Sequence, residues 1–172
     1  MKKWVIRLLV VVIVAGISIL GVSLYRSMTT PEEVHFHAGF VVFDNGQKQD
    51  FSDYKYMHNK PCGEKDEHEK LSKDEEQNEK AHLHDNVGDV VHVHRNSATW
   101  KDLFTNMHVP IDYAKVTAYI NGEEVRGFSN QPIHAYESVI IFIGDVNTDF
   151  LKDAVTKEHI MRIEQKSENC GE

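Results

Sequence analysis

The sequence is poor in cysteine and lacks the motifs of several common enzyme classes. Its two cysteines, Cys62 and Cys170, do not form a CxxC pair, so dithiol oxidoreductase chemistry lacks its usual reactive group. No Gly-rich phosphate loop, Ser-His-Asp arrangement or acid–base pair of carboxylates stands out. Basic residues are outnumbered, 19 Lys and Arg against 27 Asp and Glu, which gives a net charge of −8. This charge argues against nucleic acid or an anionic membrane surface as a partner.

Long hydrophobic runs are also absent, except for one near the N-terminus. Residues 8–25 contain no charged residue and no polar stripe, and a helix of that length just spans a bilayer core. The run predicts a transmembrane signal anchor, because three basic residues precede it and only Arg26 follows closely. A cleaved signal peptide is the alternative, with Gly21-Val22-Ser23 as a possible cleavage site. We therefore expect a single-pass protein of the cell membrane, with residues 1–7 cytoplasmic and the remaining chain outside.

The two cysteines both fall on the expected outer side, where disulfides persist. A bridge between Cys62 and Cys170 would close a loop of more than 100 residues, for which chain entropy allows about 4–5 kcal/mol of stabilisation. The alternative is that one or both are thiolate metal ligands, and His58 lies four residues before Cys62. The oxidising compartment favours the disulfide.

Beyond a tether over residues 26–34, the pattern predicts a β-rich extracytoplasmic domain over residues 35–147. A C-terminal helix and tail should follow over residues 148–172, where the sequence is moderately amphipathic. Residues 63–80 form a polar insertion in which Leu71 is the only apolar residue. Such a stretch cannot bury a core, so it is expected to be solvated.

Local motifs indicate several elements of this domain. Asn45-Gly46 and Asn121-Gly122 each stand between strand-like segments and predict type I′ hairpin turns. Thr99 and Asp102 have the spacing of a helix capping box. The same segment carries an apolar stripe at helical spacing, which predicts a core-facing helix. The residues of this stripe are Trp100, Leu103, Phe104 and Met107. The run SVIIFIGD, residues 138–145, is typical of a strand buried on both faces.

The order of strand, short helix, YINGEEV hairpin and closing ESVIIFIGD strand resembles the ubiquitin-like β-grasp of small sulfur-carrier proteins, over residues 89–145. Sulfur carriers end in a Gly-Gly tail, whereas this chain runs 28 residues past Gly144, so the resemblance does not imply carrier function. The whole chain is similar to a group of small, single-pass, histidine-rich bacterial and archaeal proteins of unknown function. The expected fold class is α+β: an N-terminal transmembrane helix, a mainly antiparallel, β-hairpin-rich domain with a β-grasp-like part, and a C-terminal helix.

Histidines are the most informative residues of the chain. Three HxH pairs occur in VHFHAGF and in HLHDNVGDVVHVH: His35 and His37, His82 and His84, and His92 and His94. Because side chains alternate along a strand, burial of Leu83, Val91 and Val93 turns the neighbouring histidines to the opposite face. Phe36, Ala38, Phe40 and Val42 make the same division in the first segment. All six histidines are therefore expected to project from the side of the sheet that faces away from the core.

This spacing suits a metal site. HxH on a strand points two imidazoles the same way, at about 6.5–7 Å between Cα atoms. A facing strand adds two more at about 5 Å. Nitrogen donors of this kind fit zinc first and copper or nickel next. The hypothesis is a divalent transition metal, Zn²⁺ or Cu²⁺, held by the six histidines, with Asp85 and Asp89 as further ligands or as acceptors for the imidazole N–H groups.

Functions of three further classes fit the same sequence. The stretch VHFHAG has a local likeness to the ligand strands of α-type carbonic anhydrases, so a zinc hydrolase or carbonic-anhydrase-like enzyme is one alternative. The chain is too short for that enzyme's sheet, and six histidines favour saturated binding over an open catalytic site, so no catalytic residue is assigned. A pH-sensing patch of imidazoles would use the same six side chains without a metal. A non-catalytic cell-surface interaction module would need none of them.

Overall fold

The computed structural model describes residues 4, 16, 21, 33–58 and 72–167. Residues Glu33–Glu172 form one compact unit, built on a mixed seven-stranded sheet in the order β3-β4-β1-β7-β5-β6, with β2 paired to β1. The strands are β1 (Glu33–Asp44), β2 (Gln47–Lys48), β3 (Ala81–His82), β4 (Val90–Arg95), β5 (Val116–Ile120), β6 (Glu123–Val125) and β7 (Ser138–Ile143). In the described part of the chain the α-helices are α2 (Lys73–Asn78), α3 (Trp100–Asn106) and α4 (Lys157–Ser167). Four short 3-10 helices join them: η1 (Tyr54–Tyr56), η2 (Tyr113–Lys115), η3 (Phe128–Asn130) and η4 (Thr148–Asp153).

Strand β1 is the centre of the sheet. It pairs antiparallel with β4 on one side and in parallel with β7 on the other, from Gly39 opposite Ser138 to Asp44 opposite Ile143. The prediction of a mainly antiparallel, hairpin-rich domain is therefore wrong for the central pair β1–β7, which makes the sheet mixed, whereas the other described strand pairs are antiparallel. The β-grasp-like part expected over residues 89–145 is not a unit of its own, because β1 runs between β4 and β7. Hydropathy along a strand shows which face is buried but not which distant strand lies beside it, so the sequence pattern missed this pairing.

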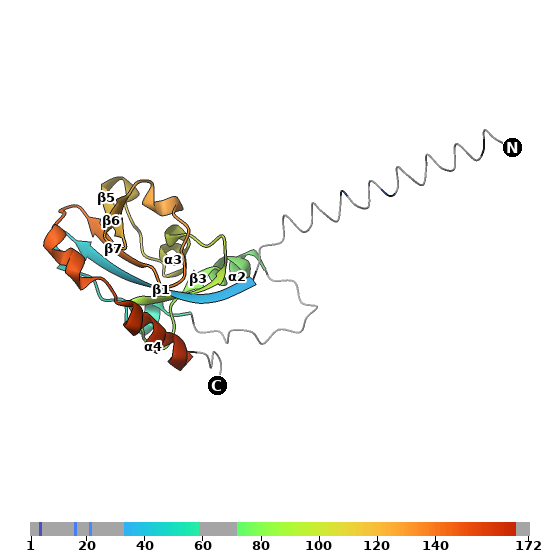
Figure 1. The fold of residues 1–172 in the computed structure, drawn as a ribbon, viewed down its shortest axis with the longest axis horizontal. Helices are drawn as coiled ribbons and strands as arrows, with labels where there is room; N and C mark the ends of the chain where they lie inside the picture. The colour runs from blue at the N-terminus through green and yellow to red at the C-terminus, as the bar shows by residue number, and fades with distance from the viewer. Residues whose placement is uncertain (1–3, 5–15, 17–20, 22–32, 59–71, 168–172) are drawn as a thin grey trace. The chain divides into compact units, whose positions relative to one another are not determined.

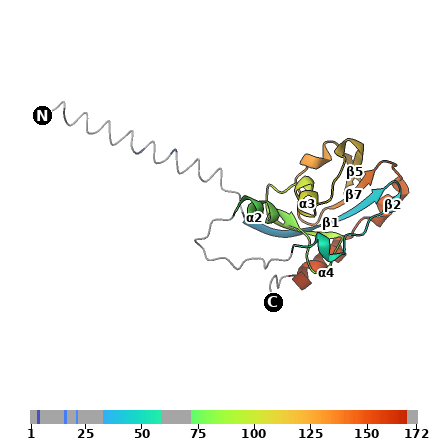
Figure 2. The ribbon, with the colours of Figure 1, turned by 180° about the vertical axis from the view of Figure 1, so that it is seen from behind.

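The two faces of the sheet are covered by different helices (Figures 1 and 2). Helix α3 packs on one face, in a buried cluster that includes Ala38, Phe40, Val42, Leu83, Val91, Val93, Trp100, Leu103 and Phe104. On the other face a smaller cluster of Val41, Phe43, Ile140 and Phe142 packs against η4 and the chain that follows it. The expected terminal helix over residues 148–172 is interrupted, because Ala154 leaves helical geometry between η4 and α4. Helix α4 packs on β1 and belongs to the same unit.

Several local predictions are confirmed. Asn45 and Gly46 have φ angles of 46° and 79°, and Asn121 and Gly122 have φ angles of 51° and 86°, as a type I′ turn requires. Helix α3 begins with the expected capping box between Thr99 and Asp102. These features are set by neighbours a few residues apart, so the sequence alone is sufficient to predict them.

The loop after His84 turns at Asp85 and Asn86 and not at its glycine, Gly88. The positive φ angles fall on Asp85 (57°) and Asn86 (56°) rather than on Gly88. Gly88 is needed for a different reason: a Cβ there would lie 2.4 Å from the backbone nitrogen of Ser52. The loop therefore packs directly against the backbone at Ser52, where no larger residue fits.

The structure corrects the predicted membrane anchor. Among the residues that it describes, no helix is long and apolar enough to span a bilayer. This finding overturns the transmembrane helix of the expected fold class, the signal anchor and the single-pass localisation at the cell membrane. The fold class is instead mixed α/β, with one seven-stranded sheet. The prediction depended on the hydropathy of residues 8–25, which lie outside the described residues except for Gly16 and Gly21.

Part of the expected polar insertion is ordered against the domain. Helix α2 begins with a capping box between Ser72 and Glu75 and buries no residue of its own. It is held instead by polar contacts to α3, where the Gln77 side-chain amide donates to Asp102 at 3.0 Å and the Lys80 ammonium lies 2.9 Å from the same carboxylate. Residues 63–71 of the predicted insertion lie outside the described residues, as do Cys62 and Cys170 with their predicted disulfide.

Candidate metal centre

Three neighbouring strands bring the histidine pairs together. His35 and His37 lie on β1, His82 ends β3, and His92 lies on β4 with His94 two residues further. In the register of the sheet His92 stands opposite both His37 and His82. The three side chains therefore form a row across β1, β4 and β3, one strand spacing apart.

His92 is the hub of a cluster of imidazole rings. Its ring centroid lies 4.3 Å from that of His35, 4.4 Å from His37, 4.5 Å from His94, 4.6 Å from His84 and 5.4 Å from His82. The Nε2 atom of His84 also contacts Nδ1 of His92 directly. The structure thus brings all six predicted histidines into one cluster, including His84, which lies just beyond the end of β3.

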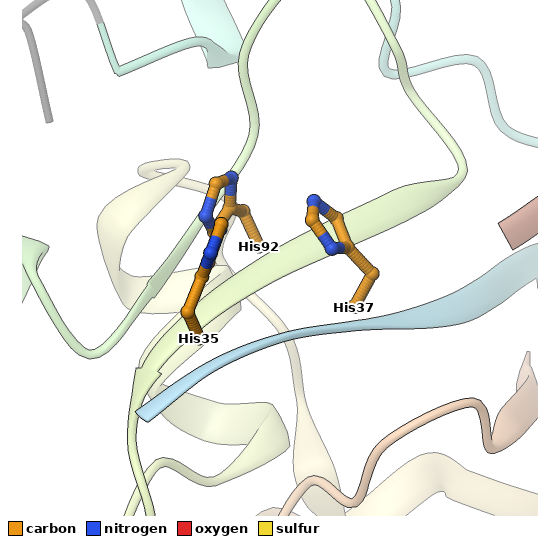
Figure 3. A group of neighbouring side chains, drawn as sticks. All are labelled: His35, His37 and His92. Atoms are coloured by element: carbon orange, nitrogen blue, oxygen red, sulfur yellow. The ribbon is translucent and has the colours of Figure 1, made fainter. Parts of the chain in front are cut away.

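Two sets of three histidines present ring nitrogens close enough together to hold an ion after small ring movements. His35, His37 and His92 form one set, and His82, His92 and His94 form the other; in each, the nitrogens lie within 4.8 Å of one another. Figure 3 shows the first set, with all three rings on the same side of β1 and β4. His92 belongs to both sets.

The face of the sheet is as predicted, but the exposure of the histidines is not. His37, His82 and His92 are only 1%, 2% and 1% exposed, although they project away from Leu83 and Val93 on the opposite face. For His37, helix α4 is the first reason, because its Glu164 lies against this histidine. Gly39 on β1 allows the chain just before α4 to approach the strand closely, since a Cβ at Gly39 would lie 2.5 Å from the Cβ of Val155. The second reason is that the rings cover one another.

Oxygen acceptors lie within hydrogen-bond distance of Nδ1 in two of the rings, and a carboxylate lies slightly further from Nδ1 of a third. The Nδ1 atom of His82 lies 3.0 Å from the carbonyl oxygen of Asn78, and that of His84 lies 2.6 Å from Oδ2 of Asp85. The Nδ1 atom of His37 lies 3.6 Å from Oε1 of Glu164. A ligating histidine is commonly held in this way by an acceptor for its second nitrogen, which leaves Nε2 to bind the ion.

Of the two predicted acidic acceptors, only Asp85 lies at the cluster. Asp89 turns to α4 instead, where its carboxylate lies 3.3 Å from Nε2 of His159. Sequence reasoning missed Glu164, whose Oε2 accepts a hydrogen bond of 2.7 Å from the Tyr136 hydroxyl. Nothing near Glu164 in the sequence indicates this role, because the helix that carries it reaches β1 only in the folded chain.

A seventh histidine, His58, was also missed as a member of the cluster. Its ring centroid lies 4.8 Å from that of His82, and its backbone N–H donates to the carbonyl of Leu83 at 2.7 Å. It stands alone in the sequence, without a second histidine two residues away, so the HxH pattern could not find it. His58 and His82 line a cavity of about 170 Å³ together with Met57, Asn78 and Met107, among others.

The buried imidazoles are neutral at physiological pH. Burial, reinforced by neighbouring histidines, lowers the pKa of His37 to about 4 despite the opposing effect of Glu164. Burial and the nearby His58 lower the pKa of His82 to about 3, although the Asn78 carbonyl acts in the other direction. Burial and the four surrounding histidines lower the pKa of His92 further still. Metal ligation requires the neutral ring, so these side chains hold the form that can bind an ion.

Comparisons with protein-family models, with curated proteins and with solved structures find no match to this chain. Its function must therefore be inferred from the chemistry of the cluster. The candidate ligand atoms are imidazole nitrogens, with the carboxylates of Asp85 and Glu164 behind them. Nitrogen donor sets of this kind suit Zn²⁺, Cu²⁺ and Ni²⁺ better than Mg²⁺ or Ca²⁺, which prefer oxygen.

Proposed function

We propose that this protein binds a divalent transition metal ion, zinc or copper, through the histidines of β1, β3 and β4. The observation that carries the proposal is the pair of histidine sets around His92, in each of which the ring nitrogens lie within 4.8 Å of one another. Zinc accepts three or four such nitrogens at about 2.0–2.1 Å after small ring movements, and copper binds the same donors in tetragonal geometry.

The placement of the histidines favours ligation over a purely structural role. Further along the same face of β1 the chain carries Val41 and Phe43, which are buried among apolar side chains. A face built for stability alone would continue with apolar residues, because burying an imidazole costs free energy that a hydrocarbon side chain does not cost. His37 and His92 stand at such buried positions, next to one another and with their rings in the neutral form that binds an ion.

The orienting acceptors point to the same function. Each of Asn78, Asp85 and Glu164 lies near the Nδ1 atom of a different histidine. A surface patch of incidental histidines has no need for three separate acceptors, whereas a metal site uses them to fix the tautomer and the direction of each ring. Zinc is the first choice of ion because it tolerates varied histidine geometry, and copper follows from its higher intrinsic affinity for nitrogen donors.

The first test is the metal content of the full chain, purified without a tag and without added metal. The second compares zinc and copper binding by calorimetry at pH 7.5 in the wild type and in a double variant, His82→Asn with His92→Asn. Asparagine keeps a polar amide at each position, so the change removes ligands without creating large apolar cavities. We expect at least a hundredfold loss of affinity in this variant.

A matched control carries the same chemical change outside the cluster. His134 is exposed and takes no part in the ring contacts of the cluster. The variant His134→Asn should bind as the wild type does. Equal affinity in the cluster variant and in this control would refute the proposed function.

A further inference from the structure

The cluster contains more imidazoles than a single ion can use. Seven histidines contact one another across β1, β3, β4 and the segment after η1: His35, His37, His58, His82, His84, His92 and His94. A zinc ion in a structural site takes four ligands. Either several of these rings play no part in binding, or the cluster holds more than one ion.

The candidate ligands form two overlapping sets around His92, although the rings of His35 and His94, one from each set, also stack at 5.3 Å. His35 and His37, both on β1, complete one set of three, and His82 and His94 complete the other. The two sets have only His92 in common. An imidazole has two ring nitrogens that point in different directions, so one ring can serve two ions at once after it loses its remaining N–H proton.

Each set also has its own orienting acceptor. In the first, Glu164 on α4 lies against Nδ1 of His37 and is itself held by the Tyr136 hydroxyl. In the second, the Asn78 carbonyl at the end of α2 holds Nδ1 of His82. The two acceptors come from separate elements of the fold.

Electrostatic repulsion is the main obstacle to binding two neighbouring dications. Carboxylates next to the cluster reduce this repulsion. Two doubly charged ions repel each other strongly inside a protein unless anionic groups lie close by. Glu164 and Asp85 each place a carboxylate next to a histidine of the cluster. Deprotonated His92 would contribute a third negative charge directly between the ions.

We propose that the cluster binds two divalent transition metal ions that share His92, one with His35 and His37 and the other with His82 and His94. This proposal rests on the proposed function and adds the number of ions and the bridging residue. On binding, the His84 ring moves away from Nδ1 of His92, with which it is in contact. His92 releases its ring proton to solvent, and each of its nitrogens donates one electron pair to one ion. No electron transfer is involved, and the oxidation state of both ions is unchanged.

Binding stoichiometry tests this proposal with Zn²⁺ as the probe. The full chain, loaded with zinc and freed of excess by gel filtration, should retain two ions per chain. His35→Asn and His94→Asn each remove a ligand that belongs to one set only, and each should retain one ion. Neither side chain is fully buried, so both variants are expected to fold. His134→Asn, outside the cluster, should retain two.

Paramagnetic resonance with Cu²⁺ tests the bridge itself. Two copper ions joined by one deprotonated imidazole are magnetically coupled, so the wild type loaded with two equivalents should give a much weaker signal than two isolated ions. His92→Asn should bind less copper and restore an uncoupled signal for whatever remains bound. A full, uncoupled signal in the wild type would overturn the shared role of His92.

The two proposals fail in different ways. Retention of one zinc ion per wild-type chain would overturn the two-ion inference and leave the proposed function intact. Two ions in both His35→Asn and His94→Asn would also overturn it, because the ions would then lie elsewhere. Absence of any zinc or copper binding by the wild type would overturn the proposed function and the inference with it.

Discussion

Acidification of the metal-free protein should destabilise it well before its carboxylates protonate. His37, His82 and His92 are buried, and burial lowers their pKa values from the ordinary 6.5 to about 4 for His37, to about 3 for His82 and further for His92. In the unfolded chain the same rings titrate near 6.5. Unfolding therefore takes up protons below pH 6.5, and the free energy of unfolding must fall as the pH falls. The free energy of unfolding keeps its full value above about pH 6.5, and the part that depends on these three neutral rings is lost progressively towards pH 4 and below.

The size of the effect follows from the distance between the pH and the ordinary pKa. At pH 5.5, one unit below 6.5, each ring that stays neutral in the folded state lowers the free energy of unfolding by about 1 kcal/mol relative to pH 7.5. The three buried rings together should lower it by roughly 3–4 kcal/mol. This is a large part of the total stability of about 5–15 kcal/mol that is usual for a folded domain.

Urea denaturation of the full chain after EDTA treatment, at pH 7.5, 6.5 and 5.5, measures this loss. His82→Asn should reduce the loss by about 1 kcal/mol, because an amide does not titrate in this range. His134→Asn, at an exposed position, should leave the loss unchanged. Equal stability of the wild type at pH 7.5 and 5.5 would refute the reasoning, since it would mean that the rings are not kept neutral by burial.

Three substitutions away from the histidines test the packing that positions them. Leu83→Ala, at a fully buried position in the cluster under α3, should cost about 2–5 kcal/mol in urea denaturation, and a cost below about 1 kcal/mol would contradict the assigned core face. Asp102→Ala removes both the capping box of α3 and the acceptor for Lys80. The free energy of unfolding should fall by about 1–2 kcal/mol, and the melting temperature should fall with it. An unchanged melting temperature would show that α2 is not held through this carboxylate. Gly88→Ala places a Cβ 2.4 Å from the backbone nitrogen of Ser52 and should cost about 1–3 kcal/mol, whereas a neutral effect by thermal unfolding would mean that the loop can move aside.

The sequence by itself determined the features that depend on near neighbours. Alternation assigned Leu83 and Val93 to the core face, and the histidines between and around them to the other face, because the side-chain period of a strand is two whatever lies beside it. The Asn121-Gly122 turn and the capping box of Thr99 with Asp102 were predictable for the same reason. Each of these features involves residues no more than a few positions apart.

The pairing of distant strands was decided only by the tertiary structure. The sequence suggested that two HxH pairs lie on facing strands, but it did not pair His82 with His92, place β1 next to β4 or set β7 in parallel with β1. Strand pairing across long loops depends on the packing of the whole sheet, and several pairings satisfy the same alternation of apolar and polar residues. The hub position of His92, in contact with rings from both neighbouring strands, exists only because of this strand order.

Burial of the histidines could likewise not be predicted from the sequence. Alternation turns His37 and His92 away from α3, but it cannot show that α4 returns to cover the same region or that Glu164 meets His37 there. The approach depends on Gly39, whose missing side chain leaves room for Val155. Solvent exposure is a property of everything packed above a side chain, and here that includes a helix more than 100 residues away in sequence from β1. The side chains of the candidate site could therefore be named from the sequence, whereas their protonation state and orientation could not.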